Sequence, residues 1–153
     1  MPRDTPEQAR ARDLRYRERS GDHVARYQAS DGADGYDDNR HGAPTLLLTT
    51  TGHRGGRPVT TPLYFAEDED RYVVIASYAG ADTHPKWYLN LAADPSVFVQ
   101  VRADRFAARA RTAGTDERER LWRLLADRYP FYDDYRTETD RDIPVVVLER
   151  AED

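Results

Sequence analysis

The apolar residues of this chain come in short runs divided by turn residues, and this spacing limits the fold more than any other feature. The longest run, Tyr72–Ala76, has five residues. Short runs rich in valine, leucine and isoleucine are typical of β-strands. None approaches the roughly 18 consecutive apolar residues that a membrane-spanning helix needs. We therefore expect a fold built mainly from short strands.

Six segments have the composition of strands, and most are joined by hairpin turns. Gly55-Gly56 marks the first turn, and the acidic run Glu67–Asp70 marks the second. Val97–Val101 alternates apolar and polar residues, as a half-buried strand does. The predicted strands are Leu46–Thr51, Val59–Phe65, Tyr72–Ser77, Val97–Val101, Phe106–Ala110 and Ile143–Leu148.

Helices are predicted at two places in this region. Pro85 is permitted in the first turn of a short helix that runs through Leu91. Thr115 can cap a second helix over residues 116–129, which has an inward stripe of leucines and is stopped by Pro130. About six strands with two or three helices predict an α+β fold around a small β-barrel.

The N-terminal part of the chain is polar and separate in character. Residues 1–22 carry mixed charges, so we expect a solvated helix or a disordered tail. His23–Tyr27 has the character of a helix end, and residues 28–43 are rich in glycine and aspartate, which predicts a loop. Residues 23–153 then form one domain, as a length of 153 residues allows.

Composition excludes several classes of function. A net charge of −5 and a pI near 5.4 argue against a nucleic-acid binder. The absence of cysteine excludes disulfides and thiolate catalysis, and the four histidines lack the spacing of metal ligands, so we expect no metal. The N-terminus lacks the apolar segment of a secretory signal, which predicts a cytoplasmic protein.

The loop Gly52–Arg57 is the first candidate site. Its glycines let backbone N–H groups approach an anion, and its two arginines can fork onto phosphate oxygens. Arginine supplies 22 of the 23 basic residues, the exception being Lys86. The alternative is a hairpin turn with two solvated arginines, and the loop taken alone favours that alternative.

The segment Ser77–Leu91 is the second candidate site. Small residues at a strand end permit a flat ring to stack on the backbone, and the start of a helix favours negative charge. The alternative places Trp87 in the core and Tyr88 on the surface. Asn90, between two leucines, has no evident structural role in the sequence, which leaves the two interpretations balanced.

Tyr129, Tyr132 and Tyr135 form the third candidate site. These three phenols follow one another at intervals of three residues around a proline. A phenol can donate a hydrogen bond to an oxygen on which negative charge develops. The alternative is aromatic packing at the end of a helix.

Taken in order, several segments resemble the deazaflavin-dependent nitroreductase family, whose cofactor is coenzyme F420. They are Leu46–Gly52 (LLLTTTG), Pro62–Phe65 (PLYF), Ala76–Ser77, Pro85 followed by Trp87–Leu91 (WYLNL), and Tyr129–Arg150 with its TDR and IPVVV sequences. The resemblance extends over roughly 23–150. It implies a split β-barrel of the FMN-binding, PNP-oxidase-like type.

The resemblance also implies where the cofactor lies. The phosphate-bearing tail of F420 is expected at the loop after the first strand and along the second strand. The flat ring is expected at the end of the third strand, against residues 86–90. The implied cofactor-binding residues are His53, Arg54, Gly55, Arg57, Val59, Thr60, Thr61, Pro62, Leu63, Ala76, Ser77, Tyr78, Lys86, Trp87, Tyr88, Asn90 and Tyr132.

This chain departs from the family pattern at several of these positions. His53-Arg54-Gly55-Gly56 stands where a basic pair followed by serine or threonine and glycine is usual, and Thr61 stands where asparagine is usual. Val59 and Tyr78 stand where basic residues are usual. We therefore expect fewer basic contacts to the cofactor tail. Arg57, two residues before Val59, is expected to replace the basic residue that is usual at position 59.

The function that the resemblance implies is transfer of a hydride from reduced F420 to a small organic acceptor. The acceptor is a quinone, an activated C=C bond or a nitroaromatic compound. The hydroxyls of Ser77, Tyr129, Tyr132 and Tyr135 are the catalytic candidates, because they can steady charge or deliver a proton. Two alternatives are an FMN-dependent reductase of the same fold and a non-enzymatic F420 carrier. The sequence leaves open a peripheral contact with membranes and the formation of a homodimer.

Overall fold

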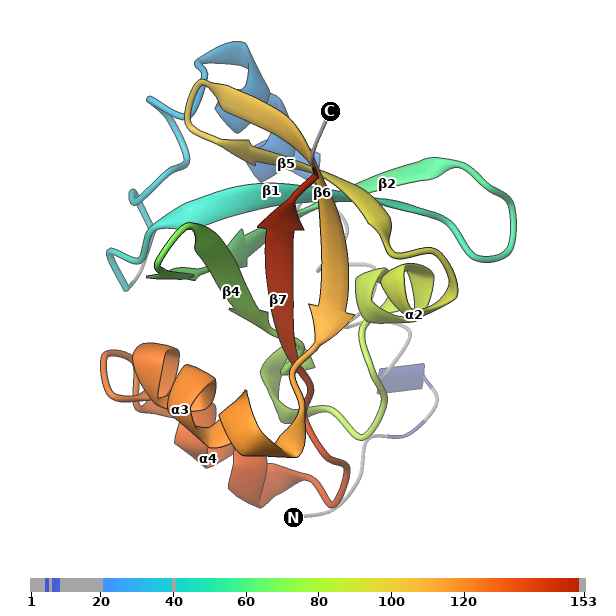
Figure 1. Cartoon of the computed structure of the whole chain (residues 1–153), viewed down its shortest axis with the longest axis vertical. Helices are drawn as coiled ribbons and strands as arrows, with labels where there is room; N and C mark the ends of the chain where they lie inside the picture. The colour runs from blue at the N-terminus through green and yellow to red at the C-terminus, as the bar shows by residue number, and fades with distance from the viewer. Residues whose placement is uncertain (1–4, 6, 9–20, 40, 152–153) are drawn as a thin grey trace.

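One antiparallel sheet organises the chain (Figure 1). The computed structural model describes residues 5, 7–8, 21–39 and 41–151. In these ranges seven strands lie side by side, in the order β2 (Pro58–Tyr64), β1 (Thr45–Thr51), β5 (Ser96–Val101), β6 (Asp104–Thr112), β7 (Val145–Arg150), β4 (Arg71–Ile75) and β3 (Ala66–Asp68).

The sheet curls because its two edge strands follow one another in the chain. β2 ends at Tyr64 and β3 begins at Ala66, although the two strands occupy opposite edges of the sheet. A single residue spans at most about 3.6 Å, so the edges must come together. β2 accordingly lies against β4 as well as against β1. The predicted split β-barrel class is confirmed.

The strands of this barrel bury side chains on both of their faces. On β7, Val146 and Leu148 pack inside the barrel, whereas Val145 and Val147 pack outside it against helices. β4 divides its side chains in the same way. Strands covered on both faces have no polar face, which explains the continuous apolar runs of these two strands.

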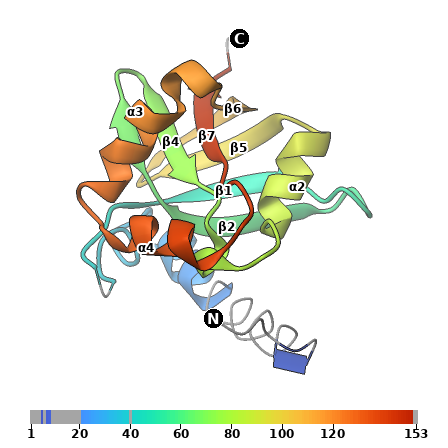
Figure 2. The ribbon, with the colours of Figure 1, turned by 90° about the horizontal axis from the view of Figure 1, so that it is seen from below.

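The helices cover different parts of the sheet (Figure 2). α3 (Thr115–Ala126) and α4 (Phe131–Glu138) cover the outer face of β4 and β7. α2 (Lys86–Ala93) lies against β1 and adds Trp87 and Leu91 to the inner core. The short 3-10 helix η1 (Tyr78–Gly80) follows β4.

Residues 21–29 form a further helix, so the helix predicted at His23–Tyr27 is present and runs two residues further than expected, into the predicted loop 28–43. Tyr27 attaches this helix to the barrel. Its buried hydroxyl donates to the carbonyl of Thr45 at 3.0 Å and accepts from the backbone N–H of Arg102 at 2.7 Å. The predicted polar tail, residues 1–22, lies mostly outside the described residues.

Three predictions about secondary structure need correction. The acidic run Glu67–Asp70 overlaps the short strand β3, because residues 66–68 pair with residues 71–73. The predicted helix over 116–129 ends at Ala126, and Pro130 opens the separate helix α4, which the sequence interpretation missed. α3 is capped at Gly114 rather than at Thr115, because the side chain of Glu117 reaches back to the N–H of Gly114.

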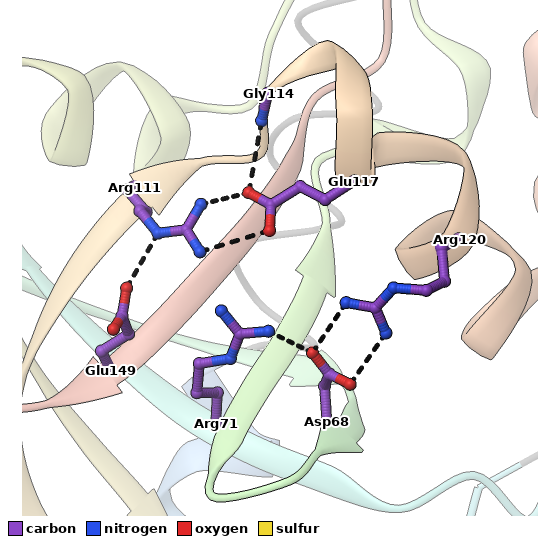
Figure 3. Close-up of polar contacts among 7 residues, drawn as sticks. All are labelled: Asp68, Arg71, Arg111, Gly114, Glu117, Arg120 and Glu149. Carbon is purple, nitrogen blue, oxygen red and sulfur yellow. Dashed lines mark hydrogen bonds and ion pairs between the residues drawn. The ribbon is translucent and has the colours of Figure 1, made fainter.

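Ion pairs fix α3 to the barrel (Figure 3). Asp68 on β3 accepts hydrogen bonds from Arg71 and, at 2.9 and 3.2 Å, from Arg120 on α3. In a second group of ion pairs, Arg111 on β6 donates to Glu117 on α3 and to Glu149 on β7. The two arginines hold the pKa of Asp68 at about 2, below its ordinary value of 3.8.

The contribution of Asp68 to stability should therefore depend on pH. Its carboxyl group has a lower pKa in the folded protein than in the unfolded chain, so its stabilising effect is complete above about pH 4 and disappears as the pH falls toward 2. Asp68→Asn should lower the free energy of unfolding by on the order of 1 kcal/mol at pH 7, and the difference from wild type should narrow below about pH 4 and close toward pH 2. Urea unfolding at several pH values measures this difference. Glu69→Gln, in the same turn, is the control, and an equal loss in both variants would contradict the prediction.

Candidate functional site

The loop between β1 and β2 is an exposed turn that carries several donor groups. His53, Arg54 and Arg57 are all exposed. The N–H of Gly52 donates to the carbonyl of Arg57 at 2.7 Å, which closes the base of the loop. Gly56 adopts a φ of +71°, a region that favours glycine. Within the described residues, no atom lies within 4 Å of a Cβ placed on Gly55 or Gly56, so the backbone there faces open space.

Asn90 holds this loop against α2. Its side-chain oxygen accepts from the backbone N–H of His53 at 3.0 Å and lies 2.6 Å from the Nδ1 of the same histidine. Its amide nitrogen donates to the hydroxyl of Thr50 on β1 at 3.1 Å. An amide oxygen only accepts hydrogen bonds, so His53 carries its proton on Nδ1 and leaves Nε2 for another partner. Asn90 is 3% exposed, and this network is the role that the sequence did not reveal.

The predicted residues of β2 lie on its two faces. Thr61 is buried, while Leu63 packs against the inner core. Thr60 shares a hydrogen bond of 2.8 Å with the hydroxyl of Thr49 on β1. Val59 is 39% exposed, beside the loop, and Pro62 is half-buried.

The segment after β4 joins the sheet to α2. Ala76 and Ser77 are buried at the strand end, and Tyr78 adopts a left-handed φ of +46° at the start of η1. Gly80 adopts a φ of +77°, and a Cβ there would lie 2.8 Å from a carboxylate oxygen of Glu138 on α4. α4 therefore packs directly against this segment, which needs glycine at that position.

α2 connects the loop to the strand end. Its Asn90 accepts a hydrogen bond from the backbone of the loop. His84, just before the helix, contacts Arg141, and Arg141 also donates to the carbonyls of Ala76 and Ser77 at the strand end. Asn90 lies four helical steps, about 6 Å, from the start of α2 at Lys86, so the two predicted halves of the cofactor site lie within reach of one elongated molecule. Lys86 is exposed at the start of the helix.

The aromatic residues of α2 have structural contacts. Trp87 is 4% exposed and packs in the inner core, which agrees with the structural alternative for this residue. Tyr88 is half-buried, and its hydroxyl lies 2.9 Å from that of Thr112 on β6. Little of the Trp87 side chain is therefore open to a ligand.

Four tyrosines gather between β2 and α4. Tyr129, Tyr132 and Tyr135 come from the predicted group, and the sequence interpretation did not include Tyr64 on β2. The rings of Tyr64 and Tyr129 lie 6.2 Å apart, as do those of Tyr132 and Tyr135. The signal that could have revealed Tyr64 is its place in the PLYF segment. We call these four residues the tyrosine cluster.

Tyr132 is the most enclosed member of the tyrosine cluster. Its side chain is 5% exposed and packs on Trp122 and Phe131. Burial raises the pKa of its phenol, and the neighbouring phenols of the cluster raise it further. Among the described residues, none forms a hydrogen bond with the Tyr132 hydroxyl. A buried hydroxyl without a partner is costly, so this atom fits a hydrogen-bond acceptor on a ligand.

These features meet the needs of a phosphate-bearing cofactor with a flat ring. The loop offers cationic and neutral donors, the strand end offers small side chains, and the tyrosine cluster offers a hydroxyl in need of a partner. In the described ranges, no group of three or more acidic or histidine side chains could hold a metal ion. No helix in the described part of the chain is long and apolar enough to span a membrane.

Comparison with known proteins identifies the family. The family model of the F420H(2)-dependent quinone reductases matches residues 18–150. An F420H(2)-dependent quinone reductase of Mycobacterium tuberculosis is 39% identical over 135 residues, which cover 84% of this chain and 87% of that protein. A solved structure described as an F420-H2 dependent reductase is 40% identical, with a TM-score of 0.64 over 69% of this chain and 94% of the other. Another, described as a domain-swapped dimer, is 36% identical, with a TM-score of 0.68 over 87% and 96% of the two chains.

The predicted membership of an F420-dependent reductase family is thereby confirmed. Both the length of the match and the level of identity support it, and the matched residues include the loop, α2 and the tyrosine cluster. The chain belongs to the F420H(2)-dependent quinone reductase family.

Proposed function

We propose that this protein transfers a hydride from reduced F420 to a small quinone. Family membership carries this proposal, because the match runs through every part of the candidate site. The geometry supports it independently, since α2 contacts a donor-rich loop through Asn90 and begins close to a strand end of small residues.

The proposed binding mode uses both ends of the site. Arg54 and Arg57 would pair with the phosphate of the cofactor tail, together with the Nε2 of His53. The ring would lie against Ala76 and Ser77, whose small side chains let a flat group approach the backbone. Backbone N–H groups of the loop would add to phosphate binding whatever side chains stand beside them.

The tyrosine cluster would act on the acceptor. When bound, F420 supplies the hydride, while the protein supplies placement and electrostatics. The raised pKa of Tyr132 keeps its proton in place at neutral pH, so the phenol can donate a hydrogen bond but cannot serve as a base. Such a bond strengthens as negative charge develops on a quinone oxygen, which lowers the barrier to transfer. Ser77 is a second donor, at the strand end.

A flat aromatic acceptor suits this part of the site. Phe131 lies 4.6 Å from the ring of Tyr132 and 5.6 Å from that of Tyr135, and aromatic rings favour stacked or edge-on contacts with a quinone. Nitroaromatic and activated C=C acceptors, a cytoplasmic location and contact with membranes stay predictions. The similarity to a domain-swapped dimer supports a homodimer.

The test is a fluorescence titration of the purified protein with F420, followed by oxidation of reduced F420 in the presence of menadione. We expect both binding and menadione-dependent oxidation. Binding without oxidation would favour the carrier alternative. Failure to bind F420, with recovery of flavin-loaded protein, would replace the proposal with the FMN-dependent alternative.

Tyr132→Phe should lower kcat for menadione by about tenfold to a hundredfold, because one donor to the developing negative charge is removed. The Kd for F420 should change less than about twofold, since the ring of residue 132 keeps its packing. Tyr72→Phe is the matched control, because Tyr72 stacks on Phe106 away from the site. Unchanged turnover in Tyr132→Phe would remove the role proposed for this hydroxyl.

A further inference from the structure

Arg141 lies in the connection between α4 and β7, and its guanidinium contacts the backbone of the segment after β4. Its Nε donates to the carbonyl of Ala81 at 2.7 Å. Its two terminal nitrogens donate to the carbonyls of Ser77 at 2.6 Å and Ala76 at 3.1 Å. One side chain thus fixes carbonyl groups at both ends of the segment Ala76–Ala81.

The same guanidinium reaches the start of α2 through His84. One of its terminal nitrogens lies 3.0 Å from the Nδ1 of His84. A guanidinium has donors and no acceptor, so His84 accepts this bond and has no proton on Nδ1. Burial and the nearby positive charge both lower the pKa of His84, in agreement with a neutral ring. The His84 ring in turn lies 5.0 Å from that of Tyr88.

The segment held by Arg141 contains strained backbone. Tyr78 has a left-handed φ of +46° without being glycine. This conformation is unfavourable for a residue with a side chain and persists only where the surroundings enforce it. The bonds from Arg141 to Ser77 and Ala81 lie on either side of Tyr78, so they supply that restraint.

Arginine suits this task better than lysine. Its planar fork presents donors in fixed directions, and here four donor contacts point to four different acceptors. The side chain is also half-buried, and burial lowers the pKa of Arg141. Partial burial of a charged group costs free energy. The four hydrogen bonds of Arg141 offset this cost and fix the backbone conformation of Ala76–Ala81.

We propose that Arg141 is a positioning residue that shapes Ala76–Ala81 to receive the flat ring of the cofactor. This inference rests on the proposed function, because the ring-facing role of Ala76–Tyr78 comes from it. Arg141 itself contacts backbone and His84 rather than the reacting atoms. Its effect on catalysis is therefore indirect and passes through the backbone of Ser77 and Tyr78.

Arg118 provides a matched control. It also donates from a guanidinium to a backbone carbonyl, that of Ile143, at 2.7 Å. The bond is made to the same connection between α4 and β7, yet it does not touch Ala76–Ala81. Arg118→Met and Arg141→Met therefore remove the same charge and the same kind of bond from neighbouring places.

The first measurement needs no cofactor. Hydrogen exchange followed by mass spectrometry reports on the amides of Gly80 and Ala81, which donate to the carbonyls of Ser77 and Tyr78 at 3.0 Å. We expect exchange in this segment to be at least tenfold faster in Arg141→Met than in wild type, with no change in Arg118→Met. Unchanged exchange in Arg141→Met would overturn the proposal.

The second measurement is the Kd for F420, together with the absorbance band of the bound cofactor. We expect the Kd to rise about tenfold or more in Arg141→Met with an altered band, and to stay within twofold in Arg118→Met. Arg141→Lys, which keeps the charge but cannot span the same carbonyls, should lie between wild type and Arg141→Met. It also replaces Arg141→Met if that variant does not fold.

The two proposals fail in different ways. If wild-type protein does not bind F420, the proposed function is wrong, and with it the ligand assigned to this segment. If wild type binds F420 and Arg141→Met binds it equally well with the same absorbance band, the positioning role is wrong while the proposed function stands.

Discussion

Asn90→Leu should raise the Kd for F420 by about tenfold to a hundredfold and leave kcat at saturating cofactor nearly unchanged. Leucine has a similar volume but cannot accept from the backbone of His53 or donate to Thr50. The loop 52–57 then loses its attachment to α2 and adopts its binding conformation only part of the time. The affinity for F420 falls in proportion to the share of molecules whose loop is in the binding conformation. The substitution does not touch the tyrosine cluster. Fluorescence titration and steady-state kinetics measure the two quantities.

Gln100→Leu is the matched control for this variant. Gln100 is another buried side-chain amide, and it donates to the carbonyl of Arg102 at 2.9 Å, away from the loop. Both variants should lose stability, because each removes the hydrogen bonds of a buried side-chain amide. Only Asn90→Leu should lose affinity. An unchanged Kd in Asn90→Leu would show that the loop keeps its shape without Asn90.

Trp122→Ala should lower the free energy of unfolding by about 3–5 kcal/mol, because it removes a fully buried indole and leaves a cavity. The melting temperature should fall by on the order of 10 °C. The indole N–H donates to Asp133 on α4 at 2.8 Å, and its ring lies 6.3 Å from that of Tyr132. The substitution therefore also loosens α4, and turnover should fall with stability.

Leu124→Ala is the control for Trp122→Ala. Leu124 lies on the same helix but is 36% exposed, so its truncation should cost less than about 1 kcal/mol. Calorimetry or urea unfolding distinguishes the two variants. Equal destabilisation would mean that the outer core does not depend on Trp122.

The sequence predicts most of the sheet, since short-range patterns determine it. Tyr72–Ala76 and Val145–Leu148 read as strands because β-branched and apolar residues follow one another, and both are covered on two faces of the barrel. β3 was missed because its acidic residues resemble a turn, and only pairing with residues 71–73 makes them a strand. α4 was missed because Pro130, which can end one helix, can equally precede another.

The candidate site likewise contains residues that the sequence predicts and residues whose roles only the tertiary structure reveals. The loop 52–57 and the tyrosines near α4 were predicted from residue types that carry their own chemistry. The roles of Asn90 and Arg141 depend on partners 37 or more residues away in the sequence, so no local pattern reveals them. Tyr64 joins the tyrosine cluster only because the curled sheet brings β2 toward α4.

The sequence by itself determined the class of secondary structure, the absence of cysteine chemistry and, through its motifs, the family. The tertiary structure decided which polar side chains hold the site in shape and which phenol is enclosed. The physical reason is that strand propensity is set by neighbouring residues, whereas burial and directed hydrogen bonds arise only when distant segments meet.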